Sequence, residues 1–333
     1  MTPRVAVIGA TFGAHYARAL RTPSAPAELA CIVGAGGRRS AALAADMDVP
    51  LRSIEEIGEV DAAVVAVRSA LVGGAGDEIT RQLLGRGIAV LQELPIHSRD
   101  VAESLREARR HGVGFAVNPF YPHLAPVRAF IARTAALQQH STVHRVLART
   151  CTQTLHATLF VLAQALQGPP PRSAEVFPGR TGHLVRMDWA GSEVDLLIAS
   201  RLDPDDPDNL AQPLMAYTVS AEDGELQLDH PHASCRWLPR PHVCEGWPLH
   251  PDAPSSVVLP PTKEPTIGAA LTELWPEAIA RALERVLGTP TLPDQRTLAV
   301  LRLWESISAE LPAPAPARAL APVDRTADLA AIR

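Results

Sequence analysis

The chain has 333 residues, and 31 Lys and Arg against 36 Asp and Glu give a formal net charge of −5 at pH 7. This length predicts about two domains, and 47% hydrophobic with 20% charged residues is typical of a globular protein and excludes wholesale disorder. The mild negative charge argues against a protein that binds nucleic acid or an anionic membrane surface.

The sequence also carries information on the compartment. No apolar run approaches the roughly 18 residues that a membrane span needs, and the first residues lack the apolar region and cleavage site of a signal peptide. Cys235 and Cys244 could form a disulfide, but four cysteines in so long a chain indicate reduced thiols. We therefore expect a soluble cytoplasmic protein.

The first 120 residues alternate between short apolar runs and helix-like segments. This alternation predicts βαβ units and a doubly wound parallel sheet, in an N-terminal domain that spans residues 1–121. Strands are expected at Arg4–Ile8, Leu29–Val33, Ala62–Val67, Ile88–Leu91 and Gly114–Val117, and helices at Ala14–Leu20, after Ser40 as an N-cap, at Gly76–Leu84 and at Arg99–Arg110.

Beyond Tyr121 the strand–helix alternation ends. Helices followed by several β-like stretches predict an α+β domain with a mainly antiparallel sheet over residues 122–311, and the Pro- and Ala-rich residues 312–333 predict an extended or disordered tail. The expected helices are Leu124–Ala136, Leu155–Leu166, Ile267–Leu287 and Gln295–Leu311, and the expected strands are Thr142–Arg149, Leu184–Trp189, Val194–Ala199, Met215–Val219 and Leu226–Leu228.

The first strand runs into Gly9-Ala10-Thr11-Phe12-Gly13-Ala14 and then a helix. A glycine turn between strand and helix lets a dinucleotide pyrophosphate sit on the helix N-terminus. Thr11 occupies the position of the usual second glycine and could donate its hydroxyl to phosphate. We expect Gly9, Thr11, Phe12 and Gly13 to contact a dinucleotide; the alternative is a tight turn without a ligand.

The end of the second strand bears on the choice of dinucleotide. An NAD site usually offers Asp or Glu to the ribose there, but this chain reads Gly34-Ala35-Gly36-Gly37-Arg38-Arg39-Ser40. Guanidinium groups bind phosphate in a bidentate fork. Gly36, Arg38, Arg39 and Ser40 therefore favour the 2′-phosphate of NADP, against the alternative of a solvated basic turn.

The segment Val90-Leu91-Gln92-Glu93-Leu94-Pro95-Ile96-His97 resembles the Glu-Lys-Pro signature of the Gfo/Idh/MocA oxidoreductases, in which a Rossmann domain precedes an α+β substrate domain. In most of those dehydrogenases the lysine helps to bind cofactor and polarise the substrate oxygen. Leu94 takes its place here, which counts against a sugar or inositol dehydrogenase. His156 stands in a second-domain histidine motif without its acidic and glycine neighbours, and we expect it to be packed rather than to act as the main acid.

One branch of that superfamily has these departures together. The runs at 7–16, 67–69, 92–97 and 118–122 resemble the thiazolinyl imine reductases of siderophore biosynthesis. The resemblance implies NADPH-dependent reduction of a thiazoline C=N to a thiazolidine, on an intermediate tethered to a carrier protein of a nonribosomal peptide synthetase. It also implies a homodimer, as in many relatives.

Reduction of C=N needs a hydride, which the cofactor supplies, and a proton from an acid. His97 and Tyr121 follow strand ends, where open α/β sheets bind ligands, and both are candidate acids. Histidine titrates near a pKa of about 6.5, whereas tyrosine, near about 10, would need water exclusion or a basic neighbour such as His123. In the resembled family, both matching positions hold candidate acids.

Four further residues complete the predicted site. Arg68 and Ser69 follow a strand end where the nicotinamide half of the cofactor usually passes, and Glu93 with Pro95 could position the ribose and shape a turn. The remaining histidines have no i, i+4 pair within a predicted helix and no acidic ligand set, so no metal site is predicted. A dehydrogenase of a sugar or other small carbonyl compound, and a non-catalytic NADP-binding regulator, are the alternative functions.

Overall fold

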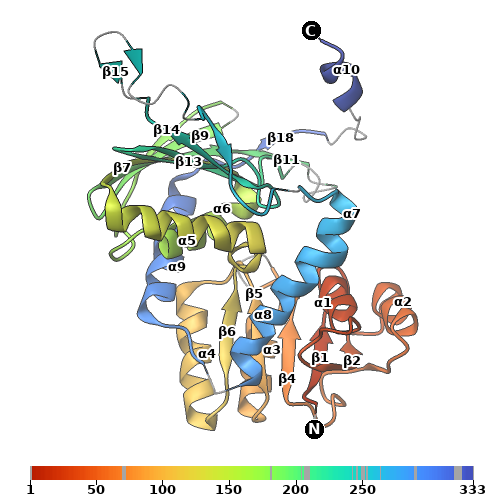
Figure 1. The fold of residues 1–333 in the computed structure, drawn as a ribbon. Helices are drawn as coiled ribbons and strands as arrows, with labels where there is room; N and C mark the ends of the chain where they lie inside the picture. Colours follow the sequence, from red (N-terminus) through yellow and green to blue (C-terminus); the bar gives the residue numbers. More distant parts are fainter. Residues whose placement is uncertain are drawn as a thin grey trace.

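The computed structural model describes residues 2–69, 73–180, 182–203, 205, 211–241, 243–244, 247–248, 252, 254–262, 264–288, 291–318 and 325–332. Two large sheets organise this part of the chain, one in each half of the sequence (Figure 1). The predicted fold class, a Rossmann sheet followed by a second and mainly antiparallel sheet, is confirmed.

The N-terminal sheet has six parallel strands in the order β3-β2-β1-β4-β5-β6. Its central strands are buried along almost their whole length, because helices cover both faces and leave no polar side to the strand. The strands are β1 (Arg4–Ile8), β2 (Glu28–Val33), β3 (Leu51–Arg52), β4 (Ala62–Val65), β5 (Ala89–Glu93) and β6 (Phe115–Asn118).

Four helices connect these strands: α1 (Gly13–Ala19), α2 (Arg38–Asp46), α3 (Gly76–Gly85) and α4 (Ser98–His111). The prediction of Ser40 as an N-cap is wrong, since α2 begins at Arg38 with Gly37 as its N-cap residue. The Ser40 hydroxyl lies instead against the end of β2, where a Cβ atom on Gly34 would come within 2.5 Å of Ser40 Oγ. The Ser40 side chain therefore packs closely against Gly34, where only a glycine fits.

A helix from the far end of the sequence completes the N-terminal layer. Helix α8 (Trp275–Leu287) packs against α1, β5 and β6 and covers the part of the sheet that α1 leaves open (Figure 1). The predicted helix over 267–287 is continuous but contains a π-helical turn, Ala270–Leu274, between α7 (Ile267–Ala269) and α8.

The second sheet has eight strands in the order β17-β14-β13-β12-β7-β10-β9-β8, and its neighbours are antiparallel except for the parallel pair β7 and β10. Helices α5 (Ala125–His140) and α6 (Leu155–Ala165) pack on one face of it (Figure 1). The strands are β7 (Val143–Cys151), β8 (Glu175–Pro178), β9 (Gly182–Trp189), β10 (Ser192–Ala199), β12 (Met215–Ala221), β13 (Gly224–Leu228), β14 (Cys235–Pro239) and β17 (Val257–Val258).

Helix α9 (Gln295–Glu310) lies between the two halves and packs against both α4 and α6. After it, β18 (Ala315–Pro316) pairs in parallel with β11 (Arg201–Leu202), so this part of the predicted tail is extended and paired. The prediction of an extended or disordered tail is wrong at Thr326–Ala330, which is helical, while residues 319–324 and 333 lie outside the described part. The short elements are the 3₁₀ turns Tyr121–His123 and Thr152–Thr154, β15 (Val243–Cys244), β16 (Trp247–Pro248) and α10 (Thr326–Ala330).

No helix in the described residues combines the length and the hydropathy that crossing a bilayer requires. Cys31, Cys151 and Cys235 are buried free thiols. The side chain of Cys244, which the sequence offered as a partner for Cys235, lies outside the described residues.

Candidate functional site

The loop between β1 and α1 is built around two glycines. Gly9 has φ +103°, and a Cβ atom there would lie 2.6 Å from the carbonyl oxygen of Ala66; a Cβ on Gly13 would lie 3.1 Å from Val7 Cγ1. Positive φ and such close backbone contact exclude larger side chains. The loop therefore bends tightly over the carboxyl end of β4 with Thr11 exposed, and this geometry fits a dinucleotide pyrophosphate.

The end of β2 presents basic groups without partners. Gly36 has φ +79° with no atom near its Cβ position, and Arg38 and Arg39 are exposed. Neither guanidinium makes a hydrogen bond or ion pair with another described residue. These side chains are free to bind an anion next to the loop at Gly9, as the predicted 2′-phosphate contact requires.

The ends of β4 and β5 are joined by a side chain. Ser69 is buried and donates its hydroxyl to the carbonyl oxygen of Pro95 at 2.7 Å. Its neighbour Arg68 is exposed, and the backbone oxygen of Arg68 accepts a hydrogen bond from Gly76 N at the start of α3. Ser69 therefore positions the turn at Pro95, and the Arg68 side chain projects into solvent at the same edge of the sheet.

Glu93, the last residue of β5, is partly exposed and lies in a polar cluster with the buried residues Tyr16 of α1 and Asn118 of β6. Its Oε1 atom accepts hydrogen bonds from the Tyr16 hydroxyl and from Asn118 Nδ2, the latter at 2.9 Å. Burial raises the pKa of Glu93 to about 8, against a smaller lowering by the Asn118 hydrogen bond. Glu93 is therefore mostly protonated at neutral pH.

An aromatic cluster lies beside the cofactor loop, and sequence reasoning identified only Phe12 and Tyr121 of its members. Phe12 contacts Phe120 in an edge-to-face arrangement with ring centroids 5.6 Å apart, and both rings contact Trp275 at the start of α8. Trp275 Nε1 donates a hydrogen bond to His232 Nε2 at 3.1 Å. A loop of the second sheet is thus connected through α8 to the cofactor loop.

His97 is the N-cap residue of α4, and its imidazole is held by a residue that sequence reasoning missed. Glu305 of α9 places Oε1 at 3.3 Å from His97 Nδ1. The same carboxylate accepts hydrogen bonds from Ser98 N at 2.5 Å and from Ser98 Oγ at 3.0 Å. Only the tertiary structure brings Glu305 to this position, because it follows His97 by 208 residues.

Tyr121 follows β6 and packs on Phe120. Burial raises the pKa of the Tyr121 phenol, and the nearby Cys151 and Glu93 raise it further. The expectation that His123 could act as a basic neighbour is wrong: burial, followed by the charges of three arginines, lowers the pKa of His123 to about 4. His123 is neutral at pH 7 and cannot make the phenol more acidic.

His156, near the start of α6, is packed as expected. Its imidazole meets the indole of Trp304 edge to face, with ring centroids 6.4 Å apart, and burial lowers its pKa to about 4. Trp304 precedes Glu305 on α9, so consecutive residues of one helix contact His156 and His97. His156 is a neutral packed side chain rather than an acid.

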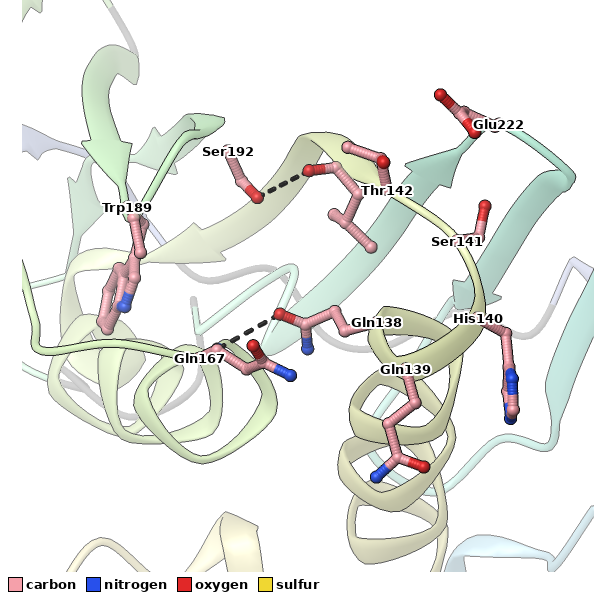
Figure 2. A pocket seen from close by; sticks show the side chains of 11 residues that line it. Gln138, Gln139, His140, Ser141, Thr142, Gln167, Trp189, Ser192 and Glu222 are labelled. Carbon is pink, nitrogen blue, oxygen red and sulfur yellow. Dashed lines mark hydrogen bonds between the residues drawn. The ribbon is translucent and has the colours of Figure 1, made fainter.

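A hollow of about 440 Å³ lies in the second domain, between the end of α5 and the hairpin of β9 and β10 (Figure 2). Amide and hydroxyl side chains line it, with Gln138 accepting a hydrogen bond from Gln167 N at 3.1 Å. None of the predicted site residues is in its lining. In the described part of the chain, no three His, Cys, Asp or Glu side chains gather to hold a metal ion.

Residues 3–119 match the Gfo/Idh/MocA family model, described as an oxidoreductase family with an NAD-binding Rossmann fold. A search of curated protein sequences finds no match. This match supports an oxidoreductase that binds a nicotinamide dinucleotide.

Solved structures share the fold at low sequence identity. UDP-N-acetylglucosamine 3-dehydrogenase GnnA from Acidithiobacillus ferrooxidans is 15% identical with a TM-score of 0.68, over 93% of this chain and 98% of that chain. GenD2 from gentamicin A biosynthesis, in complex with NAD, is 15% identical with a TM-score of 0.68, over 93% of this chain and 95% of that chain. Levoglucosan dehydrogenase, in complex with NADH and levoglucosan, is 10% identical with a TM-score of 0.68, over 93% of this chain and 98% of that chain.

Proposed function

We propose that this chain, whose residues 3–119 match the Gfo/Idh/MocA oxidoreductase family model, is an NADPH-dependent reductase of a C=N bond. Its substrate in this proposal is a thiazoline on a carrier-bound nonribosomal peptide intermediate of siderophore type, and its product is the thiazolidine. One observation carries the choice of reaction. Leu94 occupies the corner between Glu93 and Pro95 where a lysine would polarise an alcohol or carbonyl oxygen, and the chain contains a single lysine, Lys263.

The chain's own residues account for cofactor binding. The glycine loop at Gly9 holds the pyrophosphate, and Arg38 with Arg39 bind the 2′-phosphate that distinguishes NADPH. Glu93, being mostly protonated, can donate as well as accept a hydrogen bond toward the ribose. When bound, the cofactor supplies the hydride.

The proton must come from the protein or from water. His97 is one-third exposed and held at Nδ1 by Glu305, so its Nε2 is the nitrogen available to a substrate. Tyr121 is the weaker acid because its pKa is raised, and its phenol suits hydrogen-bond donation to the substrate nitrogen. We therefore propose His97 as the acid and Tyr121 as an orienting donor.

Two further parts of the proposal concern partners. The face of the second sheet opposite α5 and α6 exposes apolar side chains among charged ones, including Leu147, Phe177 and Leu197. Such a face suits a second copy of the chain, so the proposal includes a homodimer. The proposal also includes a carrier protein that delivers the tethered thiazoline to His97 and Tyr121.

NADPH oxidation is the direct test. The purified protein is supplied with NADPH and a small thioester that mimics the carrier-bound thiazoline, and mass spectrometry looks for a product heavier by two hydrogens. In parallel, NAD⁺ or NADP⁺ is offered with a panel of sugars, nucleotide sugars and inositols. Turnover with the thiazoline supports the proposal. Turnover only with a sugar would establish the alternative dehydrogenase, and cofactor binding without any turnover would indicate a regulator.

A further inference from the structure

The contact between His97 and Glu305 has the geometry of an oriented acid. An ionised carboxylate only accepts hydrogen bonds, so Glu305 requires a proton on the His97 nitrogen that faces it, which is Nδ1. Two hydrogen bonds from Ser98 fix the same carboxylate. In the described structure no other side chain hydrogen-bonds the imidazole, so Nε2 is left for a ligand.

We propose that Glu305 is a positioning residue of the reaction: it holds the Nδ1–H of His97 and thereby makes Nε2 the nitrogen that protonates the substrate. This inference rests on the proposed function, in which His97 is the acid. Its physical basis is that a histidine has two distinct nitrogens, and the partner of one decides what the other can do.

The proton transfer balances as follows. The Nε2–H bond of the His97 imidazolium breaks and a new N–H bond forms on the thiazoline nitrogen; bound NADPH would supply the hydride for the adjacent carbon. His97 is left neutral with its remaining proton on Nδ1, still bonded to ionised Glu305, and regains the lost proton from water. A neutral imidazole with its proton on Nε2 could not take part, because losing that proton would leave an imidazolate.

A purely structural role for Glu305 is the competing explanation, since its carboxylate also caps the first turn of α4 through Ser98 N. Substitutions can separate the two roles. Ser98→Ala removes the Ser98 Oγ contact and keeps the His97 contact. Glu305→Met keeps the length of the side chain but removes both oxygen acceptors, so nothing on α9 holds the proton on Nδ1. A glutamine would not serve, because its carbonyl oxygen could still accept from Ser98 N and from Nδ1. Glu310→Met changes an exposed residue at the end of α9 and is the matched control.

The experiment compares these three variants with the unmodified full-length protein. ¹⁵N NMR of histidine-labelled protein reads the tautomer of His97 in its neutral form, with the signal assigned by its loss in His97→Ala. Steady-state kinetics with NADPH and the thiazoline thioester give kcat and KM. Thermal unfolding shows that each variant is folded.

We expect the Nδ1–H form of His97 in the unmodified protein, in Ser98→Ala and in Glu310→Met, and its loss in Glu305→Met. In Glu305→Met, kcat should fall by at least about tenfold with little change in the KM for NADPH. An unchanged tautomer in Glu305→Met, or a changed tautomer with unchanged kcat, would overturn the inference. If the unmodified protein does not reduce the thiazoline, the proposed function fails, while the tautomer measurement still decides whether Glu305 positions His97.

Discussion

Asn118 donates a hydrogen bond from Nδ2 to Oε1 of Glu93 at 2.9 Å, and the two residues are direct partners in the register of β5 and β6. The carboxyl group of Glu93 thus lies at the carboxyl-terminal ends of the strands, where the glycine loop after β1 also lies. In the described part of the chain, no arginine or histidine forms an ion pair with it. Burial without a counter-charge favours the neutral acid, which is why the pKa of Glu93 rises to about 8.

This pKa predicts how stability depends on pH. The carboxyl titrates near 4.5 when the chain is unfolded and near 8 when it is folded, so the folded state binds the proton more tightly. The Glu93 contribution to stability is complete below pH 4.5 and is lost as pH rises toward 8, at up to about 1.4 kcal/mol per pH unit. Urea unfolding of the unmodified protein and of Glu93→Gln at several pH values measures the difference. The two curves should diverge as pH rises from 5 to 8, and parallel curves would contradict the raised pKa.

Gly9→Ala should impair both folding and cofactor binding. The new methyl group would lie 2.6 Å from the Ala66 oxygen at a backbone φ of +103°, which we expect to cost about 1–3 kcal/mol and to displace the loop. Gly37→Ala is the control, since nothing lies within 4 Å of its Cβ position and its φ is negative. Chemical denaturation and fluorescence titration with NADPH measure the two effects. Equal behaviour of the two variants would show that the loop tolerates a side chain.

Arg38→Ala should weaken NADPH binding by about tenfold or more and leave NADH binding nearly unchanged. The reason is the loss of a charge-assisted hydrogen bond to the 2′-phosphate, worth roughly 1.5–3 kcal/mol. Arg109→Ala removes an equally exposed arginine at the end of α4 and serves as the control. Isothermal titration with each cofactor provides the measurement. Similar affinity of the unmodified protein for NADPH and NADH would remove the basis for the NADP assignment.

Replacement of the true acid should lower kcat by roughly 10²–10⁴-fold with NADPH binding nearly unchanged. We expect His97→Ala to show this loss, and Tyr121→Phe to have the smaller effect on kcat because the raised pKa of the partly buried phenol makes it the poorer acid. Thiazoline reduction at saturating NADPH is the assay. If the double variant keeps near-normal kcat, the proton comes from water or from the substrate.

A fragment that ends at Tyr121 should be poorly soluble and inactive. It lacks α8, so the surfaces of β5 and β6 that α8 covers would be open to water. A second fragment, in which a flexible linker joins residues 1–121 to 264–288, restores that cover and should be more soluble. Size-exclusion chromatography compares the two. A soluble and fully active short fragment would show that the predicted boundary at 121 is misplaced.

Local patterns were enough to predict five of the six strands of the N-terminal sheet and the glycine loop after β1, but not the two-residue strand β3. The apolar runs at Arg4–Ile8 and Ala62–Val65 are strands because both of their faces are buried, and this burial leaves a continuous apolar run in the sequence. Gly9 and Gly13 stand out because only a residue without a side chain fits there. Each of these properties depends on a few consecutive residues, and so it can be predicted from the sequence directly.

Contacts between distant residues were decided only by the tertiary structure. The pairing of His97 with Glu305, the packing of Phe12 on Trp275 and the polar cluster of Tyr16, Glu93 and Asn118 each join separate elements. No periodicity marks Glu305 as different from other charged residues on a helix. The raised pKa of Glu93 and the lowered pKa of His123 have the same origin, since desolvation depends on which elements pack around a side chain rather than on its neighbours in sequence.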